Sequence, residues 1–207
     1  ICACLVGSEM CIRDSYKCYA EAEAGKNIEK SLKAIEERYN EIIKGLGLKL
    51  SLKEQFETIK KNFEALAGKD YAASRGEYLN GIIMANYLGY EFIDAATVIC
   101  FDKDGEFDSE KTNAVCEAKF ANIERAVVPG FYGAMPNGKV KTFSRGGSDV
   151  TGSIVARALK ADMYENWTDV SGFLAADPRI VNNAKPINVI TYKELRELSY
   201  MLSLIHI

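Results

Sequence analysis

The sequence predicts an α/β protein in which helices cover both faces of a mostly parallel β-sheet. Helical apolar patterns open the chain, and short apolar runs typical of buried strands then alternate with further helical patterns. The composition is that of a globular protein, because 48% of its 207 residues are hydrophobic and 27% are charged. A chain of this size can bury a substantial core, and disordered, collagen-like and low-complexity scaffolds are excluded.

The first half of the chain is predicted to be helical. Apolar residues three or four positions apart predict a helix over 28–46; this stripe consists of Ile28, Leu32, Ile35, Tyr39, Ile42 and Leu46. A second stripe predicts a helix over 52–66; it consists of Leu52, Phe56, Ile59, Phe63 and Leu66. A third helix is expected over 70–88 and ends at Gly89. Each stripe is too short for a coiled coil, so we expect these helices to pack within their own domain.

Strands and helices alternate in the second half. Strands are predicted over 97–101, 125–128, 140–143 and 164–168, and helices over 109–123, 150–159 and 192–201. Sheets of this kind bind ligands beyond the carboxyl ends of their strands. Polar and glycine residues directly after each strand are therefore the candidates for a functional site.

Charge and histidine content exclude several classes of function. The formal net charge is -3, so nothing indicates a nucleic-acid partner or an anionic membrane surface. No apolar run approaches the ~20 residues that a membrane-spanning helix needs, and no membrane association is expected. The one histidine, His206, stands second from the end, which argues against histidine-based triads and most zinc sites.

The six cysteines predict free thiols rather than a disulfide framework. Four of them crowd the first 18 residues, no Cys-x-x-Cys pair occurs, and Cys100 lies in an apolar run as an expected small buried side chain. Metal binding through Cys2 and Cys4 stays an alternative. Free thiols favour a reducing, cytoplasmic compartment.

Both ends of the chain differ from its middle. Residues 1–15 and 202–207 show no helical or strand period, and residues 1–15 lack the charged segment of a signal peptide. Both ends resemble translated adapter sequence, so we expect them to be non-native and to pack poorly. The alternative is that they are ordinary termini.

One glycine-rich segment imitates a phosphate-binding loop. Residues 133–140 almost match G-x-x-x-x-G-K-[ST], but Val140 replaces the hydroxyl residue that binds magnesium. A true phosphate loop also opens a helix, whereas 140–143 is strand-like. Pro136-Asn137-Gly138 is turn chemistry, and we expect a hairpin turn here.

The segment Ser144-Arg145-Gly146-Gly147-Ser148-Asp149 gives a stronger signal. Two glycines allow backbone N–H groups to approach an anion, and the start of the following helix favours negative charge. We expect Ser148 and Asp149 to cap this helix, and Arg145 to bind a carboxylate or a phosphate.

Further polar motifs follow the strand predicted over 164–168. Residues 167–172 read Trp-Thr-Asp-Val-Ser-Gly, and residues 177–179 read Asp-Pro-Arg. These motifs place Thr168, Asp169 and Arg179 at the same expected sheet edge as the glycine-rich turn. Ser74-Arg75-Gly76-Glu77 lies on the third helix, where Gly76 hints at close approach by another group, because glycine costs roughly 1 kcal/mol against alanine inside a helix.

Four motifs together resemble those of the aspartate kinases in the amino-acid kinase family. They are SRGE (74–77), FSRGGSDVTGS (143–153), WTDVSG (167–172) and DPR (177–179). The resemblance covers 16–201 and implies a partial catalytic domain, a three-layer α/β/α sandwich with a mostly parallel sheet, truncated at both ends. It also implies transfer of the ATP γ-phosphoryl group to the side-chain carboxylate of L-aspartate, the step towards lysine, threonine, methionine and diaminopimelate. ATP, Mg²⁺ and a homo-oligomeric full-length protein are implied as well.

The resemblance assigns roles to individual residues. Arg145 would hold the α-carboxylate of aspartate, Glu77 its α-amino group, and Asp149 would orient the cationic groups around the transferring phosphoryl. The junction between substrate and phosphate would be lined by Gly146, Gly147 and Ser148. ATP would be contacted by Thr168, Asp169, Phe173, Leu174 and Arg179. An aspartate carboxylate is already ionised, so no general base is required, and electrostatic stabilisation supplies the catalysis.

Some family features have no counterpart in this sequence. The expected Lys-x-Gly-Gly strand and an upstream hydroxyl residue that touches aspartate are missing, Leu174 replaces a nucleotide-stacking tyrosine, and regulatory domains do not follow. We therefore expect this chain alone to be inactive. Two alternatives stay open: a glutamate or acetylglutamate kinase, and a non-catalytic ligand-binding module of the same fold.

Overall fold

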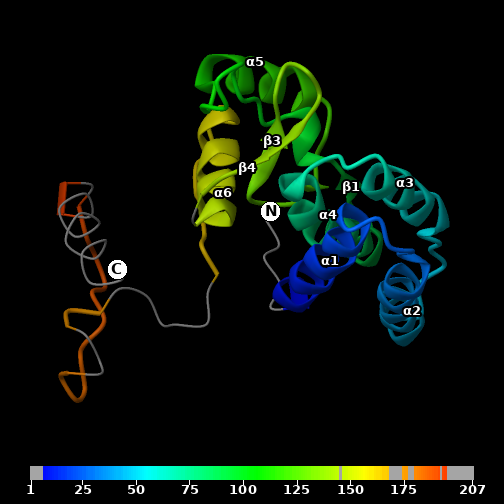
Figure 1. Cartoon of the computed structure of the whole chain (residues 1–207). Helices are drawn as coiled ribbons and strands as arrows, with labels where there is room; N and C mark the ends of the chain where they lie inside the picture. Colours follow the sequence, from blue (N-terminus) through cyan, green and yellow to red (C-terminus); the bar gives the residue numbers. More distant parts are fainter. Residues whose placement is uncertain (1–6, 145, 168–173, 177–179, 192, 195–207) are drawn as a thin grey trace. The chain divides into compact units, whose positions relative to one another are not determined.

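The computed structural model describes residues 7–144, 146–167, 174–176, 180–191 and 193–194, and they fall into two units. The first unit reaches Tyr164 and the second begins at Glu165. Among the described residues, no helix is both long and apolar enough to cross a membrane. The elements below all belong to the first unit (Figure 1).

Four helices form the first part of this unit. They are α1 (Gly7–Glu23), α2 (Glu29–Gly45), α3 (Lys53–Glu64) and α4 (Lys69–Leu88), which confirms the three helices predicted from apolar stripes and spacing. The helix α4 ends at Gly89, whose φ of +68° is the left-handed conformation that glycine adopts without strain. The helix α1 packs along α4 (Figure 1).

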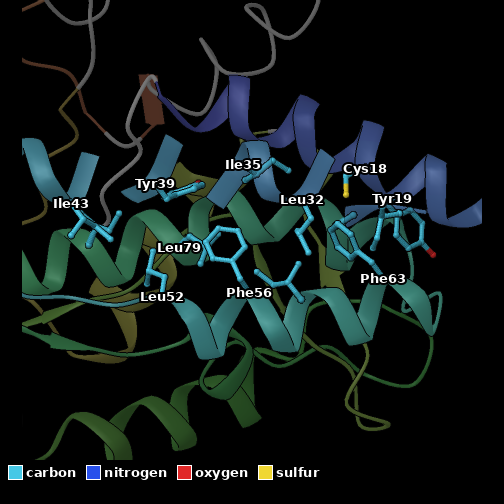
Figure 2. Packing of buried hydrophobic residues seen from close by; sticks show 14 residues of the cluster. Cys18, Tyr19, Leu32, Ile35, Tyr39, Ile43, Leu52, Phe56, Phe63 and Leu79 are labelled. Atoms are coloured by element: carbon cyan, nitrogen blue, oxygen red, sulfur yellow. The ribbon is translucent and has the colours of Figure 1, made fainter. Parts of the chain in front are cut away.

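The four helices bury a common apolar core, which Figure 2 shows. Tyr19 of α1 and Phe63 of α3 meet edge to face, with ring centroids 5.5 Å apart. The predicted stripes supply most of this core, with two corrections. On α2 the predicted residues Ile42 and Leu46 are exposed, and Ile43 is buried instead. Ile43 lies four residues after the buried Tyr39 and therefore on the same face of the helix. Leu66 lies beyond the end of α3 and is exposed.

The start of the chain departs from expectation. We expected no regular structure over 1–15, yet α1 begins at Gly7, and Ser15 is buried. Asp14 also pairs with Arg38 of α2. Residues 1–6 and 202–207 lie outside the described residues, and the origin of both ends stays a prediction.

The second part of the unit combines short strands with two helices. The elements are β1 (Glu91–Phe92), a 3-10 turn (Ala95–Thr97), α5 (Ser109–Phe120), β2 (Ala126–Val127), β3 (Tyr132–Ala134), β4 (Val140–Thr142) and α6 (Gly147–Ala158). Strands β1 and β2 pair in parallel across the crossover through α5, so the α/β class is confirmed. Strands β3 and β4 form an antiparallel hairpin, with Ala134 opposite Val140. The hairpin turn predicted in place of a phosphate loop is therefore correct.

Two strand predictions need correction. Residues 95–97 form a 3-10 turn because the Asp94 carboxylate accepts a hydrogen bond from the Ala96 amide at 3.0 Å. Of the strand predicted over 97–101, only residues 100 and 101 make β-bridges, and Cys100 pairs in parallel with Ala134. Residues 164–167 form no strand, and the Trp167 side chain is 88% exposed, unlike a side chain in a buried strand. The predicted strand residue Thr168 and most of the helix predicted over 192–201 lie outside the described residues. The short strands β1 and β3 were missed because two or three residues show no clear period.

Cysteine burial also differs from expectation. Cys100 is only partly buried, whereas Cys18 and Cys116 are fully buried. These three thiols are free. Burial raises the pKa of the Cys18 thiol and of the Cys116 thiol to about 11.

We predict that Cys18 and Cys116 resist alkylation in the folded protein. A pKa of about 11 instead of 9 lowers the thiolate fraction at pH 8 about 100-fold, and burial also blocks the reagent. Iodoacetamide labelling followed by peptide mass spectrometry should show slow reaction in the native chain and rapid reaction in urea. Equal rates in both states would contradict the packing described here.

We also predict that Gly133→Ala destabilises the fold by about 1–3 kcal/mol. A Cβ atom at this position would lie 2.7 Å from Ile99 Cγ2 and would also meet the Ile99 carbonyl oxygen. The matched control is Gly45→Ala, where a Cβ atom meets nothing within 4 Å and should stabilise α2 by up to ~1 kcal/mol. Urea unfolding measures both effects, and a neutral Gly133→Ala would show that the hairpin does not approach Ile99 closely.

Candidate active site

The glycine-rich turn follows the β3–β4 hairpin and opens α6. Gly146 is the residue before the helix and has a φ of +58°, a left-handed conformation that favours glycine. The helix then begins at Gly147, so Ser148 and Asp149 lie in its first turn. Our expectation that Ser148 and Asp149 cap the helix is wrong, because the cap position belongs to Gly146, which has no side chain.

Two close approaches hold this turn against the segment that leads into β3. A Cβ atom on Gly147 would lie 2.6 Å from Phe131 Cβ, and one on Gly130 would lie 2.9 Å from Ser148 Cα. Real Cβ atoms do not approach so closely, so both positions need glycine. Phe131 itself has a φ of +60°, which costs of order 1–3 kcal/mol in a residue with a side chain. Strain of this kind persists only where the surroundings impose it, and it is common at functional sites.

Thr151 of α6 connects the same two segments. Its hydroxyl accepts a hydrogen bond from the Phe131 amide at 3.0 Å and donates one to the Gly147 carbonyl at 2.7 Å. The side chain is fully buried. Sequence reasoning assigned no role here to Gly130 or Phe131, and it included Thr151 only as a member of the motif over 143–153, since these roles depend on contacts between segments 20 residues apart.

Asp149 is exposed at the start of α6. Among the described residues, no side chain or amide donates a hydrogen bond to its carboxylate; only its main-chain carbonyl accepts one, from Ser153 Oγ at 2.9 Å. An acidic side chain in the first turn is stabilised by the helix dipole, and this one is also open to a ligand.

Glu77 occupies a different environment on α4. Its side chain is 1% exposed, within a stretch from Ala72 to Glu77 that is buried throughout. The approach that we expected at Gly76 is made by Tyr39 of α2, whose hydroxyl donates to the Gly76 carbonyl at 3.1 Å.

The start of α4 is tied to the hairpin strand that leads to the glycine-rich turn. Thr142 of β4 donates its hydroxyl to Asp70 Oδ1 at 3.0 Å, and the Lys141 ammonium lies 3.9 Å from Asp70 Oδ2. Glu77 lies seven residues after Asp70, about two helical turns along α4. The helix that carries Glu77 and the strand that precedes Gly146 are therefore held together.

The expected ATP-binding residues lie mostly outside the description. Thr168, Asp169, Phe173 and Arg179 are among the residues that the structure does not describe, and so is Arg145, which was expected to bind aspartate. Leu174 is described in the second unit, where it makes an antiparallel bridge with Pro186 and is partly buried. The roles proposed for these residues stay predictions.

Comparisons with known proteins agree with the motifs. The profile of the amino acid kinase family matches residues 19–205, so the chain belongs to the amino acid kinase family. It is 40% identical over 139 residues to aspartokinase 3 of Bacillus subtilis (strain 168), a match that covers 63% of this chain and 31% of that protein.

Solved structures of aspartate kinases share the fold. That of Clostridium acetobutylicum aspartate kinase superposes with a TM-score of 0.83 at 56% identity and covers 91% of this chain and 44% of that one. E. coli aspartokinase III in complex with aspartate and ADP superposes with a TM-score of 0.68 at 24% identity, over 96% of this chain and 48% of that one. The chain thus spans about a third to a half of the length of these relatives.

We predict that Thr151→Val destabilises the protein by about 1–3 kcal/mol for each hydrogen-bonding group that it leaves buried and unpaired. Valine has nearly the shape of threonine, so the change removes the two hydrogen bonds and little volume. The matched control is Ser153→Ala on the exposed face of α6, which should stay within ±0.5 kcal/mol. Denaturant unfolding measures both, and equal effects would show that Thr151 does not join α6 to Phe131.

Proposed function

We propose that the protein is an aspartate kinase that transfers the γ-phosphoryl group of ATP to the side-chain carboxylate of L-aspartate and forms 4-phospho-L-aspartate. The observation that carries this proposal is the 56% identity with C. acetobutylicum aspartate kinase over 91% of the chain. The Gly146-Gly147-Ser148-Asp149 segment at the start of α6 supports it, because the first turn of a helix favours a bound anion.

The reaction joins an anionic carboxylate to a polyanionic nucleotide, so charge repulsion is the main obstacle. No base is needed, since the aspartate side chain is ionised at neutral pH. Bound Mg²⁺ would neutralise phosphate oxygens, and water molecules and phosphate oxygens would supply several of its ligands. The amides in the first turn of α6 have no partners within the helix and would donate to oxygens that gain charge during transfer.

The proposed binding and catalytic roles fall partly on described residues and partly on residues outside the description. In this proposal Glu77 binds the α-amino group of aspartate and Arg145 binds its α-carboxylate, which orients the substrate. Gly146, Gly147 and Ser148 line the junction with the phosphate. Asp149 orients the cations around the transferring group, a role that its carboxylate can take because it is exposed and makes no capping hydrogen bond to α6.

The remaining parts of the proposal rest on the resemblance. Thr168, Asp169, Phe173, Leu174 and Arg179 contact ATP. The longer protein is cytoplasmic and homo-oligomeric, and its product leads to lysine, threonine, methionine and diaminopimelate. The segment over 16–201 is the part of the catalytic domain present here.

The first test is a substrate panel with the natural protein that contains this chain. Hydroxylamine trapping of the acyl phosphate should show ATP-dependent product with L-aspartate and much less with L-glutamate or N-acetyl-L-glutamate. Preference for either of those two would instead assign another kinase of the family. No product with any acceptor would favour a ligand-binding module.

We predict that Asp149→Asn in that protein lowers kcat about 10²–10³-fold with little change in thermal stability, since it removes only a charge. The matched control is Asp108→Asn, because Asp108 is a true cap of α5 and accepts a hydrogen bond from the Lys111 amide at 2.9 Å. Asparagine caps as well as aspartate, so this control should stay active and stable. If Asp149→Asn turns over normally, Asp149 has no catalytic role.

A further inference from the structure

A cavity of about 170 Å³ lies between α3 and α4, apart from the residues assigned to aspartate and ATP. Its walls are formed by Glu54, Gln55, Thr58, Ile59, Tyr71, Arg75 and Tyr78. A single water needs only ~10–15 Å³ by a comparable measure, so there is room for a small organic or inorganic molecule. Polar groups dominate its walls, which is unlike an empty packing defect.

Arg75 brings a buried positive charge to this cavity. Its side chain is 6% exposed, and its guanidinium lies 4.3 Å from the ring centroid of Tyr71 and 4.5 Å from that of Tyr78. Nε donates to the Tyr71 carbonyl at 3.2 Å, and Nη2 donates to Ser74 Oγ at 2.9 Å. Within the described part of the chain, Nη1 has no hydrogen-bond partner and no carboxylate lies within salt-bridge distance. The tyrosine rings and these hydrogen bonds hold the guanidinium, and Nη1, which is not among the buried unpaired atoms, is left accessible to water or to a ligand.

Gln55 of α3 contributes a hydrogen-bond acceptor to the cavity, whereas Arg75 contributes donors. Its Oε1 atom is buried and accepts no hydrogen bond from any residue that the structure describes. An unpaired buried acceptor costs about as much as the hydrogen bond it forgoes. One wall of the cavity thus offers unused donors, and another offers an unused acceptor.

The carboxylates near the cavity have hydrogen-bond partners or contact solvent. Asp94, which lies near Tyr78 and Tyr132, already accepts hydrogen bonds from the Tyr132 hydroxyl at 2.7 Å and from the Ala96 amide. Glu54 is exposed to solvent. Burial raises the pKa of Tyr78, which leaves its phenol neutral and able to donate at neutral pH. Among the wall residues Arg75 is therefore the buried charge that a ligand would meet, and Glu54 is a second, solvent-exposed charge.

We propose that this cavity binds a small oxyanion that carries a hydrogen-bond donor next to its negative charge. The oxyanion accepts from the free N–H groups of Arg75, and the adjacent hydroxyl donates to Gln55 Oε1. A 2-hydroxycarboxylate and hydrogen phosphate are two sources of this chemistry. The site is independent of the proposed kinase activity, because it uses none of the residues assigned to aspartate or ATP.

The test is an NMR titration of the ¹⁵N-labelled 207-residue chain with glycolate, acetate and inorganic phosphate. We expect saturable shifts of the Arg75 Nε–H and Gln55 side-chain resonances with glycolate, with phosphate or with both. Acetate has the charge but not the donor, so it should bind about tenfold more weakly than glycolate. The ligand that saturates at the lower concentration identifies the source.

Two variants and one control locate the binding. Thr58→Trp fills the rim of the cavity and should abolish the shifts, and Gln55→Met should remove the difference between glycolate and acetate. Glu57→Gln, on the exposed side of α3, should bind as the unaltered chain does. If Thr58→Trp fails to fold, Gln55→Met decides. The proposal is overturned if no probe saturates, which would leave a water-filled cavity, or if both folded variants bind like the unaltered chain.

Discussion

The close packing of Gly147 against Phe131 is the constraint on which the candidate active site depends. Only hydrogen atoms at positions 130 and 147 let the segment before β3 reach the first turn of α6. Thr151 then joins the two segments with one accepted and one donated hydrogen bond, and Phe131 is held at a φ of +60°. These contacts fix the start of α6 in place without a ligand, as the proposed electrostatic catalysis would require.

The β3–β4 hairpin also helps to position the helix that carries Glu77. Asp70 ties the start of α4 to β4, and the buried guanidinium of Arg75 lies 5.5 Å from the ring centroid of Tyr132 on β3. Both contacts connect α4 with the hairpin that leads into the glycine-rich turn. Glu77 and the glycine-rich turn, which come from distant parts of the sequence and are proposed to bind aspartate and phosphate, therefore share one support.

Local chemistry made part of this arrangement predictable. The amphipathic stripes predicted α2 and α3, and Pro136-Asn137-Gly138 predicted the hairpin turn, because each depends on neighbouring residues alone. The glycine-rich turn was recognised for the same reason, although the residue at its cap is Gly146 rather than Ser148 or Asp149. The helix over 7–15 was missed because the residues there show no clear apolar period.

Contacts between distant segments were not predictable from the pattern. Nothing in the sequence pairs Gly147 with Phe131, or buries Arg75 among tyrosines from α4 and β3. Arg75 lies within the SRGE motif, yet only the structure shows that it lines a cavity between α3 and α4. The 3-10 turn at 95–97 likewise depends on the hydrogen bond from the Ala96 amide to the Asp94 side chain, which an apolar run does not reveal.

The most direct test of this account is a crystal structure of the longer natural protein with aspartate, ADP and Mg²⁺. We expect a phosphate or carboxylate oxygen within about 3.2 Å of the amide nitrogen of Gly147 or Ser148. We also expect the α-amino group of aspartate at the Glu77 carboxylate. Ligands bound with the first turn of α6 unoccupied, or aspartate bound away from Glu77, would contradict it.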